Sequence, residues 1–173
     1  MYAFLKLFFG ICLLKKGPQD IPASSGLLFL LIPIYAIISF LILALSTDTF
    51  NALVQIFVEI LLVLGFSKVI LYFARKPERY LQTTCALMAT DTLISLFAFP
   101  AMVSLVGQNS ALAFFSIMLL MFWHWIVSGH IFSHAVEQPL TFGLGVAFLY
   151  ILVSYQVMGF LFPELIIAEG GNT

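Results

Sequence analysis

Three ionisable residues, Glu59, Asp91 and His124, stand inside long apolar stretches of this sequence. If those stretches are membrane-spanning helices that rise about 1.5 Å per residue, all three side chains lie near the middle of the apolar layer. An ionisable group at that depth is expensive and is therefore a functional hypothesis in itself. Carboxylates and an imidazole can exchange protons there, bind a cation or hydrogen-bond to one another.

Other polar residues recur at helical spacing beside each of the three. Residues four or seven positions apart share one face of a helix. The sequence offers three such faces: Asn51, Gln55 and Glu59; Thr84, Asp91 and Ser95; and His124 and Ser128. We expect these faces to meet in the interior of the protein. Trp123 and Trp125 are expected to wall an interior that is either packed or filled by a ligand.

Two interpretations of this cluster stay open. In one, the side chains form a structural clasp of hydrogen bonds between helices, each contributing about 1 kcal/mol. In the other, Asp91 and His124 exchange a proton or bind a cation, and Glu59 acts as relay or counter-charge. No lysine or arginine stands near the expected midplane, so a protonated carboxyl or a bound cation is favoured over an internal salt bridge.

A second constellation consists of His130, His134 and Glu137, at positions i, i+4 and i+7 of one helical face. Two imidazoles and a carboxylate suit zinc or another first-row metal ion. The segment lacks the internal glutamate of the HExxH protease motif. Because it falls at an expected membrane boundary, anchoring of the helix end is the other interpretation.

The composition decides which elements must position these residues. Of the 173 residues, 62% are hydrophobic and only 9% are charged, whereas a soluble domain is about one quarter charged. A net charge of −1 with seven basic residues provides no basic surface for binding nucleic acid. Two cysteines are too few for a disulfide-stabilised secreted domain. The chain is therefore expected to be a polytopic membrane protein that contacts the lipid bilayer.

Five stretches are apolar for about the 20 residues that a spanning helix needs. They cover 26–46, 51–73, 83–106, 111–132 and 141–162, and short polar or charged turns separate them. The predicted fold is all-α, a polytopic transmembrane bundle of five helices preceded by a short N-terminal interfacial helix. Its predicted parts are 1–16 (interfacial segment), 17–25 (connector), 26–162 (transmembrane domain) and 163–173 (C-terminal tail).

The interfacial segment is too short to span a membrane and ends on Lys15 and Lys16. We expect it to lie on the cytoplasmic leaflet, with its lysines toward lipid phosphates. A re-entrant or packed stub is the alternative. Residues 17–22, with two prolines, are expected to be stiff and extended, and Ser24 or Ser25 is the expected N-cap of the first span.

Small residues indicate where helices can approach closely. Cys85, Ala86, Ala89 and Thr90 form such a row in the third span, and Gly143 and Gly145 stand at the start of the fifth.

The basic residues predict the orientation of the bundle. With the N-terminus in the cytoplasm and the C-terminus outside, all of them fall on the cytoplasmic side: Lys6, Lys15, Lys16, Lys68, Arg75, Lys76 and Arg79. The short loops favour the inner membrane of a bacterium as the location.

The layout resembles the YIP family of five-span proteins, named for binding Ypt-type GTPases, and above all its short prokaryotic relatives. The resemblance lies in the cytoplasmic N-terminal segment, five spans with tiny outer turns, and an outward C-terminus. The fourth span is also similar in running through Trp125 to Gly129 and His130 into a short inner turn. The long N-terminal region and the DLYGP-like motif of the eukaryotic members are absent from this sequence. The resemblance therefore implies a membrane fold and carries over no residue roles.

The sequence contains no GxSxG, P-loop or GxGxxG motif, which disfavours an enzyme. It predicts a non-enzymatic organiser or accessory subunit of other membrane proteins, with no cofactor and no nucleic-acid partner. One alternative is a small proton- or cation-coupled permease that uses Glu59, Asp91 and His124. The other is a membrane metalloenzyme that uses His130, His134 and Glu137.

Overall fold

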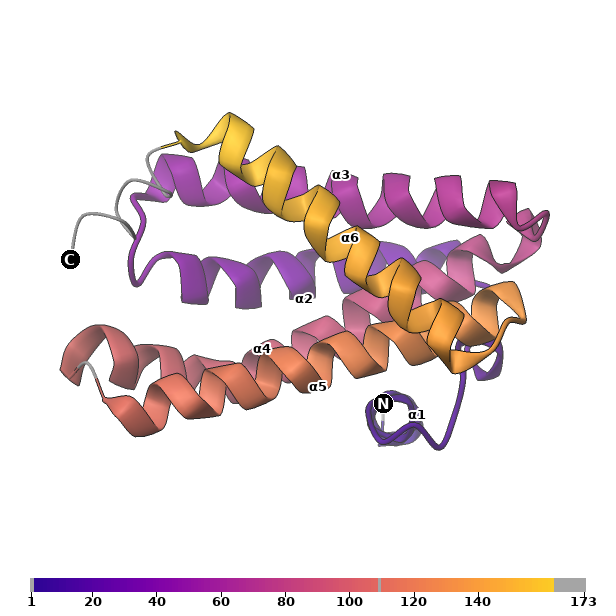
Figure 1. Ribbon diagram of the computed structural model, residues 1–173, viewed down its shortest axis with the longest axis horizontal. Helices are drawn as coiled ribbons and strands as arrows, with labels where there is room; N and C mark the ends of the chain where they lie inside the picture. The colour runs from indigo at the N-terminus through magenta and orange to yellow at the C-terminus, as the bar shows by residue number, and fades with distance from the viewer. Residues whose placement is uncertain (1, 109, 164–173) are drawn as a thin grey trace.

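The computed structural model describes residues 2–108 and 110–163, which form helices joined by short turns, with no strand among them (Figure 1). The predicted tail lies outside the described residues from residue 164 onward. The α-helices are α1 (Tyr2–Cys12), α2 (Ser25–Leu43), α3 (Thr49–Phe73), α4 (Tyr80–Gln108), α5 (Ala111–Val136) and α6 (Leu140–Leu161), and the 3-10 turns are η1 (Pro18–Asp20) and η2 (Pro77–Arg79).

Helices α2 to α6 are each long and apolar enough to cross a membrane, which confirms the all-α class and a multi-pass membrane protein. They coincide with the five predicted spans, with shifts at their ends. The largest is at the end of α5, which continues to Val136 and not to residue 132. The helix stops there because Glu137 adopts a left-handed backbone conformation, with φ 55°.

Side-chain oxygens cap the starts of two helices, as capping rules require. Ser24 precedes α2, and its hydroxyl accepts a hydrogen bond from the Leu27 amide at 3.4 Å. The expected N-cap of the first span is therefore found at Ser24. Asp48 does the same for α3, accepting from the Asn51 amide at 3.2 Å.

The core occupies the end of the bundle that carries the basic turn η2 and the α5–α6 turn (Figure 1). Residues 83–90 of α4 are all buried there, and residues 127–133 of α5 are buried beside them. The small residues expected to allow close approach, Cys85, Ala86, Ala89 and Thr90, are at most 3% exposed. Small side chains let several helices pack around α4 at once, which is how membrane helices associate.

Helices α5 and α6 make the closest crossing in this core. A Cβ on Gly143 of α6 would stand 2.1 Å from the carbonyl oxygen of Gly129 in α5 and 2.7 Å from the Ser133 amide nitrogen. No side chain fits there. A Cβ on Gly145 would meet nothing within 4 Å, so only one of the two candidate glycines is a contact point.

Packing is much looser at the opposite end. The outer halves of α4 and α5 form a hairpin that stands apart from α2, α3 and α6 (Figure 1). In α4 no residue between 95 and 107 is buried, and in α5 only Ala113 is buried before Val127. The bundle is thus closed at the basic end and splayed at the other.

Helix α1 lies across the long helices at the closed end, where Figure 1 shows it end-on. Its buried face consists of Leu7, Phe8, Ile11 and Cys12, and it packs on α4 and α5. The segment predicted to lie on the leaflet is thus also docked on the bundle.

The connector that follows is not extended throughout, as residues 17–22 were expected to be. Residues 18–20 form the turn η1, because proline is favourable at the start of a helical turn and the Asp20 carboxylate accepts a hydrogen bond from the Gly17 amide at 3.0 Å. Gln82 of α4 fixes the end of the connector by donating its amide to the Ile21 carbonyl at 2.8 Å.

Candidate functional site

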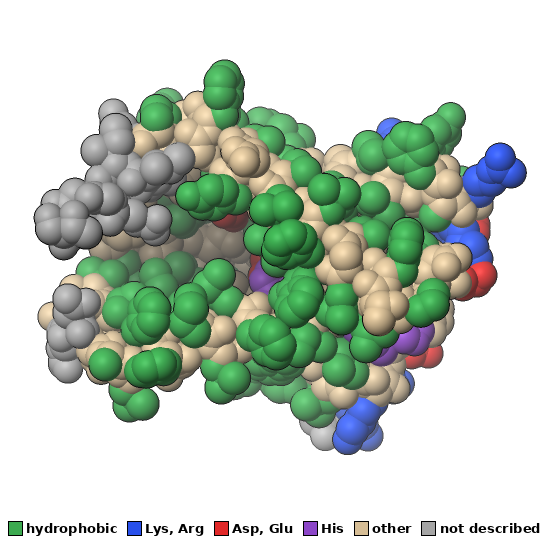
Figure 2. Space-filling view, viewed as in Figure 1, with side chains coloured by type: hydrophobic (Ala, Val, Ile, Leu, Met, Phe, Trp, Pro, Cys, Tyr) green, Lys and Arg blue, Asp and Glu red, His purple; other side chains and the backbone are tan. Residues whose placement is uncertain are grey.

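A cavity of about 460 Å³ lies between the splayed helices, and each of α2 to α6 contributes to its lining. Figure 2 shows the hollow from the side, with acidic and histidine atoms at its inner end. We call it the cleft. Its polar lining residues are Tyr35, Ser39, Glu59, Asp91, Ser95, His124, Tyr150, Ser154 and Tyr155.

The structure brings all three predicted intramembrane residues into this cleft. His124 Nε2 on α5 lies 3.4 Å from Asp91 Oδ1 on α4, an ion pair when the imidazole is protonated. On the facing helices, the Tyr35 hydroxyl of α2 donates to Glu59 Oε2 of α3 at 3.3 Å. The side chains of His124 and Asp91 remain 31% and 26% exposed, so neither is sealed by its partner.

The three predicted polar faces meet only in part. Asp91 and Ser95 line the cleft, whereas Thr84 is buried in the core and donates its hydroxyl to the Tyr80 carbonyl at 2.8 Å. Gln55 and Ser128 are likewise buried away from the cleft. Thr84 and Ser128 leave the cleft because packing toward the closed end surrounds those turns of α4 and α5. Gln55 has a different position, since it lies one turn from Glu59 toward the splayed end of α3 and is buried there.

Sequence reasoning missed the contributions of α2 and α6. Tyr35 and Ser39, and likewise Tyr150 and Ser154, are four residues apart and line the cleft. The spacing that identified the other polar faces could have found them. They were not identified because the search began from ionisable residues, and tyrosine and serine carry no charge at neutral pH.

The two tryptophans beside His124 pack against the buried core and do not line the cleft, so of the two expected surroundings the packed interior is the one found. Trp123 donates its indole N–H to the Cys12 carbonyl of α1 at 2.9 Å, and Trp125 donates to the Leu144 carbonyl of α6 at 3.1 Å. Because neighbours in a helix point about 100° apart, residues on either side of His124 cannot share its direction. Each tryptophan instead ties a neighbouring helix to α5.

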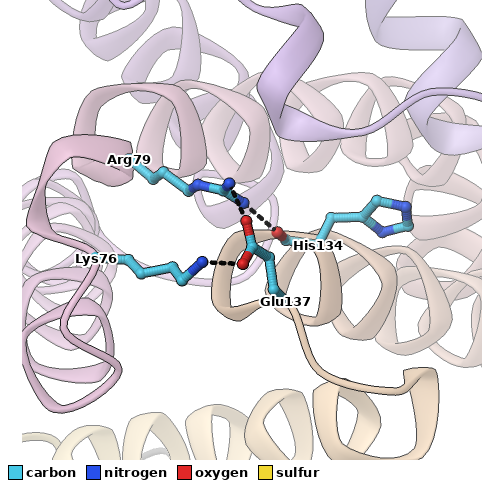
Figure 3. A network of polar contacts seen from close by, with 4 residues as sticks. All are labelled: Lys76, Arg79, His134 and Glu137. Atoms are coloured by element: carbon cyan, nitrogen blue, oxygen red, sulfur yellow. Dashed lines mark hydrogen bonds and ion pairs between the residues drawn. The ribbon is translucent and has the colours of Figure 1, made fainter.

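At the closed end, Glu137 joins two elements that are distant in sequence (Figure 3). Its carboxylate accepts from Lys76 and is paired with Arg79, while Arg79 Nη1 donates to the His134 carbonyl at 2.8 Å. The hydrogen bond from Lys76 and the charge of Arg79 hold the pKa of the Glu137 carboxyl below its usual value of 4.5. This network fixes the α3–α4 turn to the end of α5.

Each of the two histidines near this network has a ring nitrogen within hydrogen-bond distance of a backbone carbonyl oxygen. His130 Nε2 lies 2.9 Å from the Lys16 carbonyl, and His134 Nδ1 lies 3.0 Å from the His130 carbonyl. The rings are side by side, 4.2 Å between centroids, but Glu137 is turned toward the basic residues. Within residues 2–108 and 110–163, no group of three His, Cys, Asp or Glu side chains is placed to hold a metal ion.

No protein-family model, curated protein or solved structure matches this chain. Two carboxylates, an imidazole and several hydroxyls surround a space within an otherwise apolar bundle. Such a set can hold a positive charge or pass a proton between its members.

Proposed function

We propose that this multi-pass membrane protein takes up a proton or a cation at the cleft, with Asp91 and His124 as exchanging groups and Glu59 as counter-charge. It would act as a small ion-coupled permease. One observation carries the proposal: these ionisable side chains line a cavity, and Asp91 and His124 stay partly exposed to it although they contact each other. A structural clasp needs no cavity, since hydrogen bonds between helices form best where the helices touch.

The charges of the lining support the same proposal. Glu59 and Asp91 are acidic, and among the residues that the structure describes no lysine or arginine lines the cleft. An anion would meet unfavourable carboxylates, whereas a cation or proton would relieve the desolvation of these groups.

Flux through proteoliposomes tests the proposal. A membrane potential should drive proton entry, measured with a trapped pH-sensitive dye, or uptake of ²²Na⁺, above the rate of protein-free vesicles. Asp91→Asn keeps the shape and hydrogen-bonding capacity but cannot exchange a proton, so it should abolish flux. Thr92→Val is the matched control, because the Thr92 hydroxyl bonds to its own helix at Met88 and lies outside the cleft.

Two results would contradict the proposal. One is full flux in Asp91→Asn, which would leave the clasp as the role of this residue. The other is a wild-type rate no higher than that of empty vesicles for protons, for ²²Na⁺ and for a radiolabelled organic cation. Asp91→Leu measures how much the Asp91 side chain contributes to thermal stability. Because a single hydrogen bond between membrane helices is weak, the melting temperature should fall only modestly.

A second candidate is the role of organiser or accessory subunit of other membrane proteins. Helix α1 favours it, since Phe4, Leu5 and Leu13 are exposed on a segment fixed across one end of the bundle. That apolar face can contact lipid or another membrane protein. Purification in mild detergent tests the role: a chain that is always monomeric and without partners would contradict it.

The orientation and location are also proposed here. The N-terminal segment and the basic residues would face the cytoplasm, and the cleft would open on the other side of a bacterial inner membrane. The positive-inside rule supports this arrangement, because the basic turn η2 and α1 stand at one end of the bundle (Figure 1). Kinship with the YIP family is proposed on the five-span layout alone.

A further inference from the structure

The size of the cleft limits what it can take. Its volume is about 460 Å³, within the range of roughly 300–1,000 Å³ typical of pockets for small organic ligands. A bare metal cation needs a cage of several oxygens at about 2–2.6 Å. The described carboxylates of the cleft come from two helices and have other partners, His124 and Tyr35. The space is therefore too large and too sparsely charged for a dedicated metal cage.

Aromatic rings form the second feature of the lining. Tyr35, Tyr150 and Tyr155 all line the cleft, and an aromatic face attracts a cation, most strongly where water is excluded. Tyr150 is held in place by Phe66, with 5.2 Å between the ring centroids. Rings fixed in this way suit bulky ammonium groups, which cannot be gripped by close oxygen contacts.

Apolar side chains complete the lining. Ile42, Leu43, Ile151 and Met158 line the same space as the carboxylates. A monatomic ion makes no favourable contact with them, whereas the carbon groups of an alkylammonium ion do. The combination of acidic, aromatic and aliphatic side chains thus favours an organic cation.

We infer that the cleft binds an organic ammonium ion, with its positive charge beside Glu59 and Asp91 and its carbon groups against the tyrosines. The inference rests on the proposed function and names its cation. The same chemistry can be offered by a free ammonium compound or by the headgroup of a choline phospholipid, because the hollow is open on the side that Figure 2 shows.

Choline provides the direct test, since 3,3-dimethylbutan-1-ol has the same shape without the charge. The full chain is placed in nanodiscs of phosphatidylglycerol, and binding is measured by isothermal titration calorimetry. Choline should bind saturably and the neutral alcohol should not. Repeating the titration in phosphatidylcholine nanodiscs separates the sources: weakened choline binding identifies the lipid headgroup as a competitor, and unchanged binding identifies the free ion. Both results support the ammonium site.

Variants locate the site. Tyr150→Leu should weaken choline binding by about 2- to 30-fold because it removes an aromatic face, while Tyr150→Phe should bind as the wild type does. Glu59→Gln should weaken it by about tenfold or more. Tyr72→Leu is the control, since Tyr72 is exposed and lies outside the cleft. Melting temperatures measured on the same samples exclude unfolding as the cause.

Equal binding of choline and the neutral alcohol, or no binding of choline, would overturn the inference. The proposed function is judged separately by the flux of protons, ²²Na⁺ and radiolabelled choline. Proton or ²²Na⁺ flux that depends on Asp91, without choline binding, would refute the ammonium site and leave the proposed function standing. Choline binding without flux of any of the three would refute the permease, and absence of both binding and flux would refute both proposals.

Discussion

The indole N–H of Trp123, deep in α5, donates to the backbone carbonyl of Cys12 at the end of α1, across 2.9 Å. This bond joins residues 111 positions apart and fixes the N-terminal helix to the bundle. His130 and Gln82 hold the next part of the chain in the same way, through the carbonyls of Lys16 and Ile21. All three bonds leave polar side chains in the bundle satisfied by the backbone of the N-terminal segment.

Removal of the indole N–H should loosen α1. Burial leaves the Cys12 thiol 2% exposed and raises its pKa to about 12, so it should react slowly with N-ethylmaleimide. Trp123→Phe loses a hydrogen bond that contributes about 0.5–1.5 kcal/mol, and labelling of Cys12 should accelerate about 2- to 12-fold. Mass spectrometry of time points, in a Cys85→Ala background, measures this rate.

Trp125→Phe is the matched control for that labelling experiment. It removes an indole N–H that bonds to α6 and does not touch α1, so Cys12 should stay as slow as in the parent. Equal rates of Cys12 labelling in the Cys85→Ala parent, Trp123→Phe and Trp125→Phe would mean that the Trp123 hydrogen bond does not hold α1 in place.

Gly143→Ala should destabilise the protein. The added Cβ would stand 2.1 Å from the Gly129 carbonyl oxygen, and backbone cannot retreat as a flexible side chain can. Forcing α5 and α6 apart should cost about 1–3 kcal/mol and lower the melting temperature in detergent. Gly145→Ala, two residues on and in open space, should leave it unchanged or raise it slightly. A Gly143→Ala protein as stable as Gly145→Ala would contradict the close crossing.

Acid should weaken the network around Glu137. Its pKa is lower in the folded protein than in the unfolded chain, because Lys76 and Arg79 favour the carboxylate. The resulting stabilisation is complete above the unfolded pKa near 4.5 and is lost as pH falls through the folded pKa. The melting temperature of wild type should therefore exceed that of Glu137→Gln at pH 7, and the two should converge once the pH falls below the folded pKa. A difference independent of pH would show that the carboxylate charge contributes nothing.

Alkaline phosphatase fusions test the proposed orientation in bacteria. A fusion after Gly107, in the last turn of α4 at the splayed end, should be active because the enzyme folds only outside the cytoplasm. A fusion after Arg79, in the basic turn, should be inactive. The reverse pattern would place the mouth of the cleft in the cytoplasm.

The sequence predicted the spans because they follow from apolar length. It also identified Glu59, Asp91 and His124, which line one cavity, because ionisable residues stand out in apolar spans. It could not predict which turns of each helix are open. Thr84 and Asp91 share a face of α4, yet the first is buried in packed helices and the second borders a cavity. That difference arises from the splay of the α4–α5 hairpin, a tertiary feature with no local signal. The direction of Trp123 depends likewise on where α1 docks.

The splayed bundle also determines which solution the cleft can sample. Its inner end stops at Asp91, one residue beyond the buried stretch of α4, while the other end lies between helix tips. In the proposed orientation, a vestibule closed at this end would exchange with the compartment at the splayed end and with the lipid beside its open side, and the packed core would separate it from the other compartment. The occupancy of Asp91 and His124 would then report the composition of a single compartment, and passage across the membrane would require the packed half of the bundle to part.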